Sequence, residues 1–214
     1  AQEAVKVTAV GEKKYQEYSS YIAASALEDA KRCFERGLAQ LRADETPNLK
    51  SLLHRGMARL LIEMDELPTA RAHADRALNM LPVPRTSSSH AQIYVTLSDI
   101  ERGLGRLEKA KNYAQLSVNI FREFGMPDLW AALANIGLSH YEDADWTSAL
   151  DVFLEAVSVG KKVQNTSAIA MIESAMLRGL AQIKKWTNFD TILLKLTQFS
   201  DHSYAQYDSA KVLA

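Results

Sequence analysis

The sequence has little cysteine and no long apolar segment, and both absences narrow the possible classes of protein. Cys33 is the single cysteine among 214 residues, so the chain can form no internal disulfide and no zinc site built on several cysteines. A chain with so little cysteine is typical of a reducing compartment, and we predict a cytoplasmic protein. No apolar run approaches the roughly 20 residues that span a bilayer, so we expect no membrane segment.

Charge of one sign is also missing. The chain has 25 Lys and Arg residues against 26 Asp and Glu residues, a formal net charge of -1. A nucleic-acid-binding domain usually has a basic excess on one face, so we expect no direct nucleic-acid binding. The chain begins with Ala1 rather than methionine and shows no signal peptide, so we expect it to be processed or excised from something longer.

An internal repeat dominates the rest of the sequence. Ala30, Ala70, Ala110 and Ala149 are spaced by 40, 40 and 39 residues, and a further step of 40 reaches Phe189. Three residues before each position the side chain is large and apolar: Leu27, Leu67, Leu107, Trp146 and Trp186. Seven residues after it the side chain is small, with Leu196 as the exception: Gly37, Ala77, Ser117 and Ala156.

These offsets place large and small side chains on one helical stripe. Small residues allow a second helix to approach closely, and the large ones fill the space beside it. Each repeat is therefore predicted to hold two helices, helix A before the alanine and helix B around it. Neither helix can bury its stripe alone, so neighbouring repeats must stack into an all-α solenoid.

The predicted helix boundaries follow from this period and from the positions of proline and glycine. The predicted pairs are 48–63 and 67–80, 89–103 and 106–123, 128–142 and 146–160, and 166–183 and 187–199. The first repeat is either a pair broken near Ser19–Ser20 or Ser25, or one long helix over 12–42. We predict a single domain over 1–214, with repeats at about 12–43, 48–82, 88–124, 127–162 and 165–200. Residues 201–214 are either a capping helix or a truncated helix A, and we favour truncation.

The repeat resembles the tetratricopeptide-repeat (TPR) family. The fourth repeat has the family's pattern of large, small and aromatic residues: Leu133, Ile136, Gly137, Ala149, Phe153 and Ala156. The period of 40 exceeds the 34 of the commonest TPR units, and is similar to that of kinesin light chains and of sensor domains in bacterial regulators. The resemblance implies a right-handed solenoid of about five repeats, with the A helices lining a concave face where partners bind.

By this alignment the polar side chains of the A helices are candidate peptide-binding residues: Arg55, Arg59, Glu63, Gln92, Asp99, Arg102, Asn135, Tyr141, Glu142, Arg178 and Gln182. Leu138 lies among them. The arginines suit forked hydrogen bonds to carboxylates or to the backbone of an extended peptide. The alternative is that they are solvated or paired with Glu63, Asp99 and Glu142.

Residues for catalysis or for a bound cofactor are missing from the pattern. The five histidines have no metal-ligand spacing, and no glycine-rich phosphate loop occurs. His54 and His140 are predicted to be packing or groove-edge residues, and Cys33 a buried structural thiol. We therefore predict a protein that is not an enzyme and needs no cofactor or metal.

Two functions remain open. The first is a scaffold or adaptor that binds a protein or peptide in the A-helix groove. The alternative is a ligand- or peptide-sensing TPR module of a larger bacterial transcriptional or signalling regulator. A homo-oligomer that forms through the terminal repeats is a further possibility, since a truncated last helix would expose apolar surface.

Overall fold

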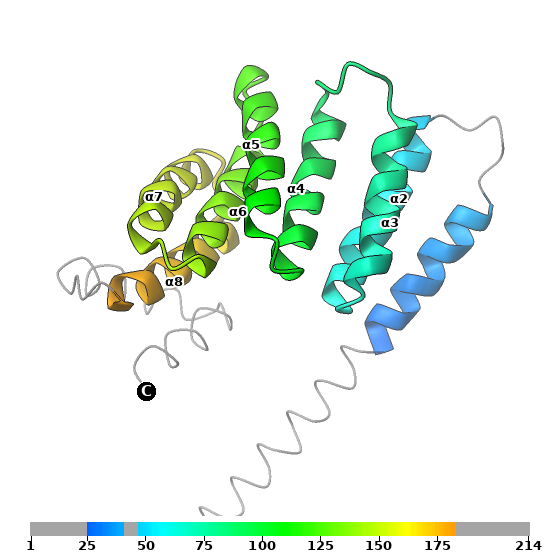
Figure 1. Cartoon of the computed structure of the whole chain (residues 1–214). Helices are drawn as coiled ribbons and strands as arrows, with labels where there is room; N and C mark the ends of the chain where they lie inside the picture. Colours follow the sequence, from blue (N-terminus) through cyan, green and yellow to red (C-terminus); the bar gives the residue numbers. More distant parts are fainter. Residues whose placement is uncertain (1–24, 41–46, 183–214) are drawn as a thin grey trace, which may run out of the picture. The chain divides into compact units, whose positions relative to one another are not determined.

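Helices make up all the regular structure that the computed structural model describes, over residues 25–40 and 47–182. One helix covers 25–39, and seven more follow: α2 Pro47–Glu63, α3 Leu67–Met80, α4 Ser88–Gly103, α5 Leu107–Glu123, α6 Leu129–Glu142, α7 Trp146–Lys162 and α8 Thr166–Gln182 (Figure 1). The boundaries predicted between 48 and 183 are correct to within two residues, and the all-α prediction is confirmed. The predicted helix 187–199 and the segment 201–214 lie outside the described residues. Each helix of the described part is too short or too polar to cross a bilayer.

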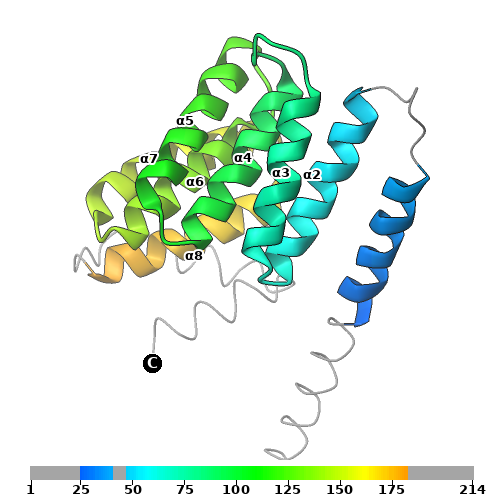
Figure 2. The same cartoon turned by 45° about the vertical axis from the view of Figure 1, so that its right-hand side comes forward.

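The chain divides into two compact units, residues 1–80 and 81–214. In the first unit α2 and α3 form a helix pair. In the second, α4 pairs with α5 and α6 with α7, and α5 packs on α6 and α7 on α8 (Figure 2). The order of contacts within each unit is that of stacked A–B repeats. The single domain over 1–214 stays a prediction.

Small residues of the B helices form the tightest part of the core. The repeat alanines Ala70, Ala110 and Ala149 are at most 1% exposed. The small residues seven positions further on, among them Ala77 and Ala156, are fully buried. Because these side chains end at Cβ or close to it, the A helices reach the B-helix backbone. This close approach allows buried hydroxyls to form hydrogen bonds between α4 and α5. Ser98 Oγ donates to Ala110 O at 2.9 Å, and Ser117 Oγ donates to Ala91 O at 2.9 Å.

In the fourth repeat, a glycine of the A helix packs against a large aromatic residue of the B helix. A Cβ added to Gly137 of α6 would lie 2.5 Å from Cε1 of Phe153 on α7, which is fully buried. In the third repeat the corresponding positions hold Ser98 and Ala114, so a larger A-helix residue faces a smaller B-helix residue. The sequence match to the TPR pattern at these positions therefore reflects complementary volumes.

Most connections between helices are closed by the same turn. After α2, α4, α5, α6 and α7 a residue with positive φ follows the helix end: Asp65, Gly105, Gly125, Ala144 and Gln164. In each case its N–H and the next N–H return to carbonyls of the last helical turn. These are Schellman motifs, which satisfy carbonyls that the helix end leaves unpaired. The α3–α4 connection differs, with a longer segment that contains Pro82 and Pro84.

Polar side chains make hydrogen bonds at the starts of α7 and α4. Asp145 precedes α7, and its Oδ1 accepts a hydrogen bond from the Ser148 N–H at 3.2 Å. Asp145 therefore caps the start of α7. Ser87 precedes α4, and its N–H donates to Nδ1 of buried His90 at 3.3 Å.

The helix over 25–39 packs on α2 within the first unit. Phe34 covers Gly56, whose added Cβ would lie 2.5 Å from the ring, and Gly37 faces Leu53. At the α2–α3 turn, Lys31 Nζ lies 2.6 Å from Glu66 Oε1. Cys33 lies at the edge of this contact stripe, which is centred on Phe34, and is exposed. The prediction of a buried thiol is therefore wrong, because the contact stripe runs through the residue next to it.

Candidate ligand-binding face

The A helices of the second unit lie side by side. Helix α4 contacts α6 directly, and α6 contacts α8, although a B helix separates each pair in sequence. Seven of the predicted binding residues lie on these helices with described side chains: Gln92, Asp99, Arg102, Asn135, Tyr141, Glu142 and Arg178. We call the surface formed by α4, α6 and α8 the A-face.

A charged cluster joins α4 to α6 at one end of the A-face. The Arg102 guanidinium donates to Glu142 Oε1 at 2.7 Å and lies 3.5 Å from Asp99 Oδ1. About a quarter of the Arg102 side chain is exposed, and its Nε is buried with no hydrogen-bond partner among the described residues. Arg102 therefore has the acidic partners Asp99 and Glu142 that the alternative interpretation expects, and its role in ligand binding stays a prediction.

Two amide side chains make further links. Asn135 Nδ2 on α6 donates to the Val95 carbonyl of α4 at 3.2 Å, and this residue is only 6% exposed. Gln92 Nε2 on α4 donates to Asp128 Oδ2, just before α6, at 3.0 Å. Asn135 therefore holds two A helices together and presents little of its amide to solvent, whereas Gln92 is half-buried.

An aromatic pair joins α6 to α7, and an arginine of α8 lies beside it. Tyr141 meets Trp146 edge to face, with ring centroids 4.8 Å apart. The Arg178 guanidinium carbon lies 5.8 Å from the centroid of the Tyr141 ring, within the range of a cation–π contact. Arg178 thus places its guanidinium beside an aromatic ring of α6.

Apolar side chains are also accessible on these helices. Leu138 of α6 is half-buried, and Met171 of α8 is 50% exposed. Met171 stands two helical turns before Arg178 and shares its face of α8. Sequence reasoning missed Met171 and Asp128. The seven-residue spacing from Arg178 is the signal that would have identified Met171.

Three predicted residues belong to the first unit. On α2, Arg55 is half-buried and engaged with other groups, whereas Arg59 and Glu63 are exposed. They share one face of that helix by spacing. Gln182 lies at the end of α8, and its side chain is outside the described residues.

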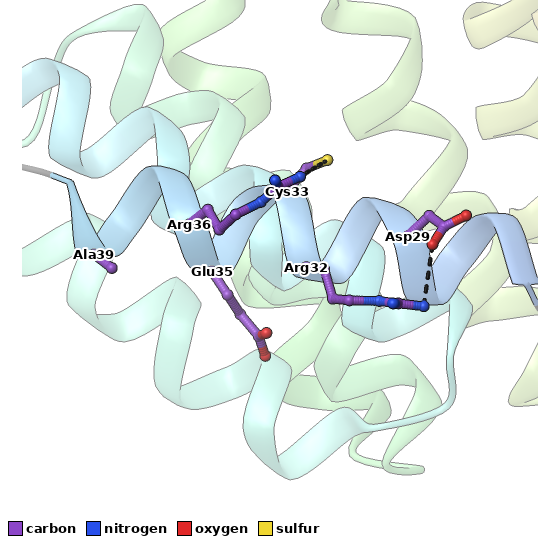
Figure 3. A pocket seen from close by; sticks show the side chains of 6 residues that line it. All are labelled: Asp29, Arg32, Cys33, Glu35, Arg36 and Ala39. Carbon is purple, nitrogen blue, oxygen red and sulfur yellow. Dashed lines mark hydrogen bonds and ion pairs between the residues drawn. The ribbon is translucent and has the colours of Figure 1, made fainter.

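A second surface feature lies on the helix over 25–39. An open hollow of about 700 Å³ is lined by Asp29, Arg32, Cys33, Glu35, Arg36 and Ala39 (Figure 3). Arg32 pairs with Asp29 at 3.1 Å, and Arg36 donates to the Cys33 sulfur at 3.4 Å. All its lining residues among those described come from one helix, so the polar groups do not converge on a common point. Over the described ranges, no three His, Cys, Asp or Glu residues are grouped so as to hold a metal ion.

Comparison with known proteins agrees with the fold. No family model and no curated protein matches the sequence. Among solved structures, BtubC (BKLC) from P. vanneervenii superposes with a TM-score of 0.68 at 14% identity, over 90% of this chain and 76% of that one. A Rap protein complexed with competence and sporulation factor gives 0.73 at 14% identity, over 80% of this chain and 48% of that one.

A third similar structure is that of TPR-like repeats from a putative kinesin light chain of Podosopora anserina. Its TM-score is 0.62 at 11% identity, and the match covers 89% of this chain and 90% of that one. The chain thus spans about half the length of the Rap protein and nearly the whole kinesin light chain array. Identities this low establish the fold alone. This chain has the fold of the TPR-like helical repeats.

Proposed function

We propose that the chain is a non-enzymatic module that binds a protein or peptide on the A-face. The observation that carries the proposal is the combination of an exposed Met171 with charged groups that the cross-helix contacts hold in place. Arg102 and Glu142 are fixed by one another, and Arg178 is fixed over Tyr141. A surface whose polar groups are already ordered loses less entropy on binding a partner.

The chemistry of the A-face suits an extended peptide with an apolar side chain and charges of both signs. Met171 offers a flexible, polarisable contact that adapts to an apolar anchor. The exposed part of the Arg102 and Glu142 pair offers a donor and an acceptor to a peptide backbone. Arg178 adds a cation beside an aromatic ring.

The non-enzymatic part of the proposal is supported by what the described side chains do. Asp99, Arg102 and Glu142 of the A-face are paired with one another. Among the described side chains of this face we find no nucleophile held beside a base. Fold alone does not decide this, because one similar structure is that of aspartyl phosphate phosphatase F from Bacillus subtilis.

A random peptide library tests the proposal, because selection from it needs no identified partner. Peptides selected on the full chain should lose binding to the variant Met171→Glu, which places a charge among the apolar contacts. The matched control is Leu154→Glu on α7, a B-helix residue that is 57% exposed against 50% for Met171. Peptides that bind both variants and the original chain equally would refute the A-face as the site.

A second candidate function is the sensor module of a larger regulator. It is favoured by the similarity to a Rap protein that was solved with competence and sporulation factor, which this chain matches over 80% of its own length. The complete gene distinguishes the two functions. A DNA-binding or signalling segment in the same reading frame supports the sensor, and a repeat array by itself supports the scaffold.

A further inference from the structure

Two histidines meet inside the α2–α3 helix pair. His54 Nδ1 of α2 lies 3.0 Å from His73 Nδ1 of α3, with ring centroids 5.1 Å apart and the ring planes tilted by 51°. His54 is 9% exposed, and His73 is half-buried. The contact joins helices across 19 residues of sequence and does not belong to the A-face.

A nitrogen–nitrogen distance of 3.0 Å fits an N–H···N hydrogen bond and constrains the protons of both rings. One Nδ1 must carry the hydrogen, and the other must offer its lone pair. At neutral pH the pair therefore holds one ring in the Nδ1–H tautomer and the other in the Nε2–H tautomer. If both neutral rings were Nε2–H tautomers, neither facing Nδ1 would carry a hydrogen. If both were Nδ1–H tautomers, both facing atoms would carry one.

The surrounding charges oppose protonation. Burial lowers the pKa of both imidazoles, and for His54 the field of His73 adds to this. Arg76 of α3 acts on both rings in the same direction. The neighbouring Arg71 and Asp75 pair with each other at 3.0 Å. The Lys31 and Glu66 pair, which brings in the helix over 25–39, lies at the α2–α3 turn.

Successive protons have different effects on the contact. A first added proton goes to the free Nε2 of the donor ring, which leaves the N–H···N bond in place. A second must go to the acceptor Nδ1, and then both facing atoms carry hydrogens. Two cationic rings would meet in a partly buried site beside Arg76, and no hydrogen bond would remain between them.

We propose that His54 and His73 form a proton-operated latch between α2 and α3, closed by one shared ring proton and opened when both rings are protonated. In the unfolded chain each histidine takes up a proton at about pH 6.5. The folded pair resists this uptake, so the unfolded or opened state binds more protons as pH falls. The latch therefore contributes fully above about pH 6.5 and is lost as pH falls through the lower values of the folded pair.

Nitrogen NMR of the full chain tests the shared proton directly. With ¹⁵N-labelled histidine at about pH 7.5, one of the two rings should show a protonated Nδ1 and an unprotonated Nε2. The other ring should show the reverse. Two Nε2–H tautomers at this pH would overturn the proposal, since no proton would then lie between the rings.

Amide hydrogen exchange tests the opening. After correction for the intrinsic pH dependence, α2 and α3 should exchange several-fold faster at about pH 5 than at about pH 7.5, relative to α6 and α7. The double variant His54→Gln and His73→Gln has no titrating group at the contact and should lose this response. The control His140→Gln, in the second unit, should keep it.

If the double variant does not fold, His73→Gln alone removes the more exposed ring and should abolish the same response. The proposal is overturned if exchange of α2 and α3 is independent of pH in the unaltered chain. It is equally overturned if the histidine variants retain the acid-induced acceleration of the unaltered chain.

Discussion

The Arg102 guanidinium of α4 donates a 2.7 Å hydrogen bond to the Glu142 carboxylate of α6, across the step from one A helix to the next. Asp99 lies on the other side of the same guanidinium at 3.5 Å. Two groups that suit ligand recognition are therefore also part of the packing between repeats. A substitution at either residue changes stability as well as the A-face, so the two effects must be measured separately.

A double-mutant cycle with Arg102→Met and Glu142→Gln measures this pair. Both side chains are partly exposed, so we expect a coupling of about 0.2–1 kcal/mol in urea unfolding. Arg102→Met alone should cost more than the coupling, because Asp99 also loses its cation. If the losses of unfolding free energy in the two single variants add up to the loss in the double variant, the pair does not stabilise the fold.

Gly137→Ala should destabilise the fourth repeat. The new Cβ would lie 2.5 Å from the buried ring of Phe153, and overpacking of this kind costs about 1–3 kcal/mol. The gain in helix propensity offsets at most about 1 kcal/mol of this. Gly179→Ala in α8 is the control, because its Cβ would meet Leu150 at an ordinary 3.7 Å. Thermal unfolding of both variants distinguishes them, and equal stability would contradict the prediction.

Ala144→Gly should stabilise the chain. Ala144 has φ of 59° in the turn after α6, and an L-residue there costs about 1–2 kcal/mol. The larger conformational entropy of glycine in the unfolded chain offsets about 0.4–1 kcal/mol of this gain in stability. We expect a net gain of about 0.5–1 kcal/mol in denaturant unfolding. The reverse change, Gly105→Ala at φ of 71°, should lose stability although no atom lies within 4 Å of the added Cβ.

The cap of α7 should depend on the charge of Asp145. Hydrogen bonds from the Ser148 hydroxyl and then from its N–H hold the pKa of Asp145 below its ordinary value. Its contribution is thus present above the unfolded value, about 3.9, and is lost as pH falls through the lower folded value. Asp145→Ala should unfold at a lower temperature at about pH 7, with the difference shrinking in acid. Asp145→Asn should retain most of the cap without the pH dependence.

The helices are predictable from sequence because their signals are local. Alanine columns, Pro68 at the start of α3 and Gly125 after α5 fix element positions through helical spacing and backbone geometry. The contact between successive A helices is predictable for the same reason, since a 40-residue period with two helices per repeat brings every second helix to the same side.

Pairings within the A-face and the α2–α3 contact are not predictable in this way. Several acids lie near Arg102 in the sequence, and only the folded geometry shows that it pairs with Asp99 and Glu142. Asn135 is a ligand-binding candidate by alignment, but its amide reaches the Val95 carbonyl. No helical spacing connects His54 to His73, because the two residues lie on different helices.

Five of the six connections in the range 47–182 close with the same Schellman geometry, and the segment between α3 and α4 does not. The exception coincides with the border between the two compact units at residues 80 and 81. It marks a natural cutting point for protein engineering. Extra residues inserted there should leave both helix stacks intact, and residues 81–214 should be transferable as a block onto another repeat array.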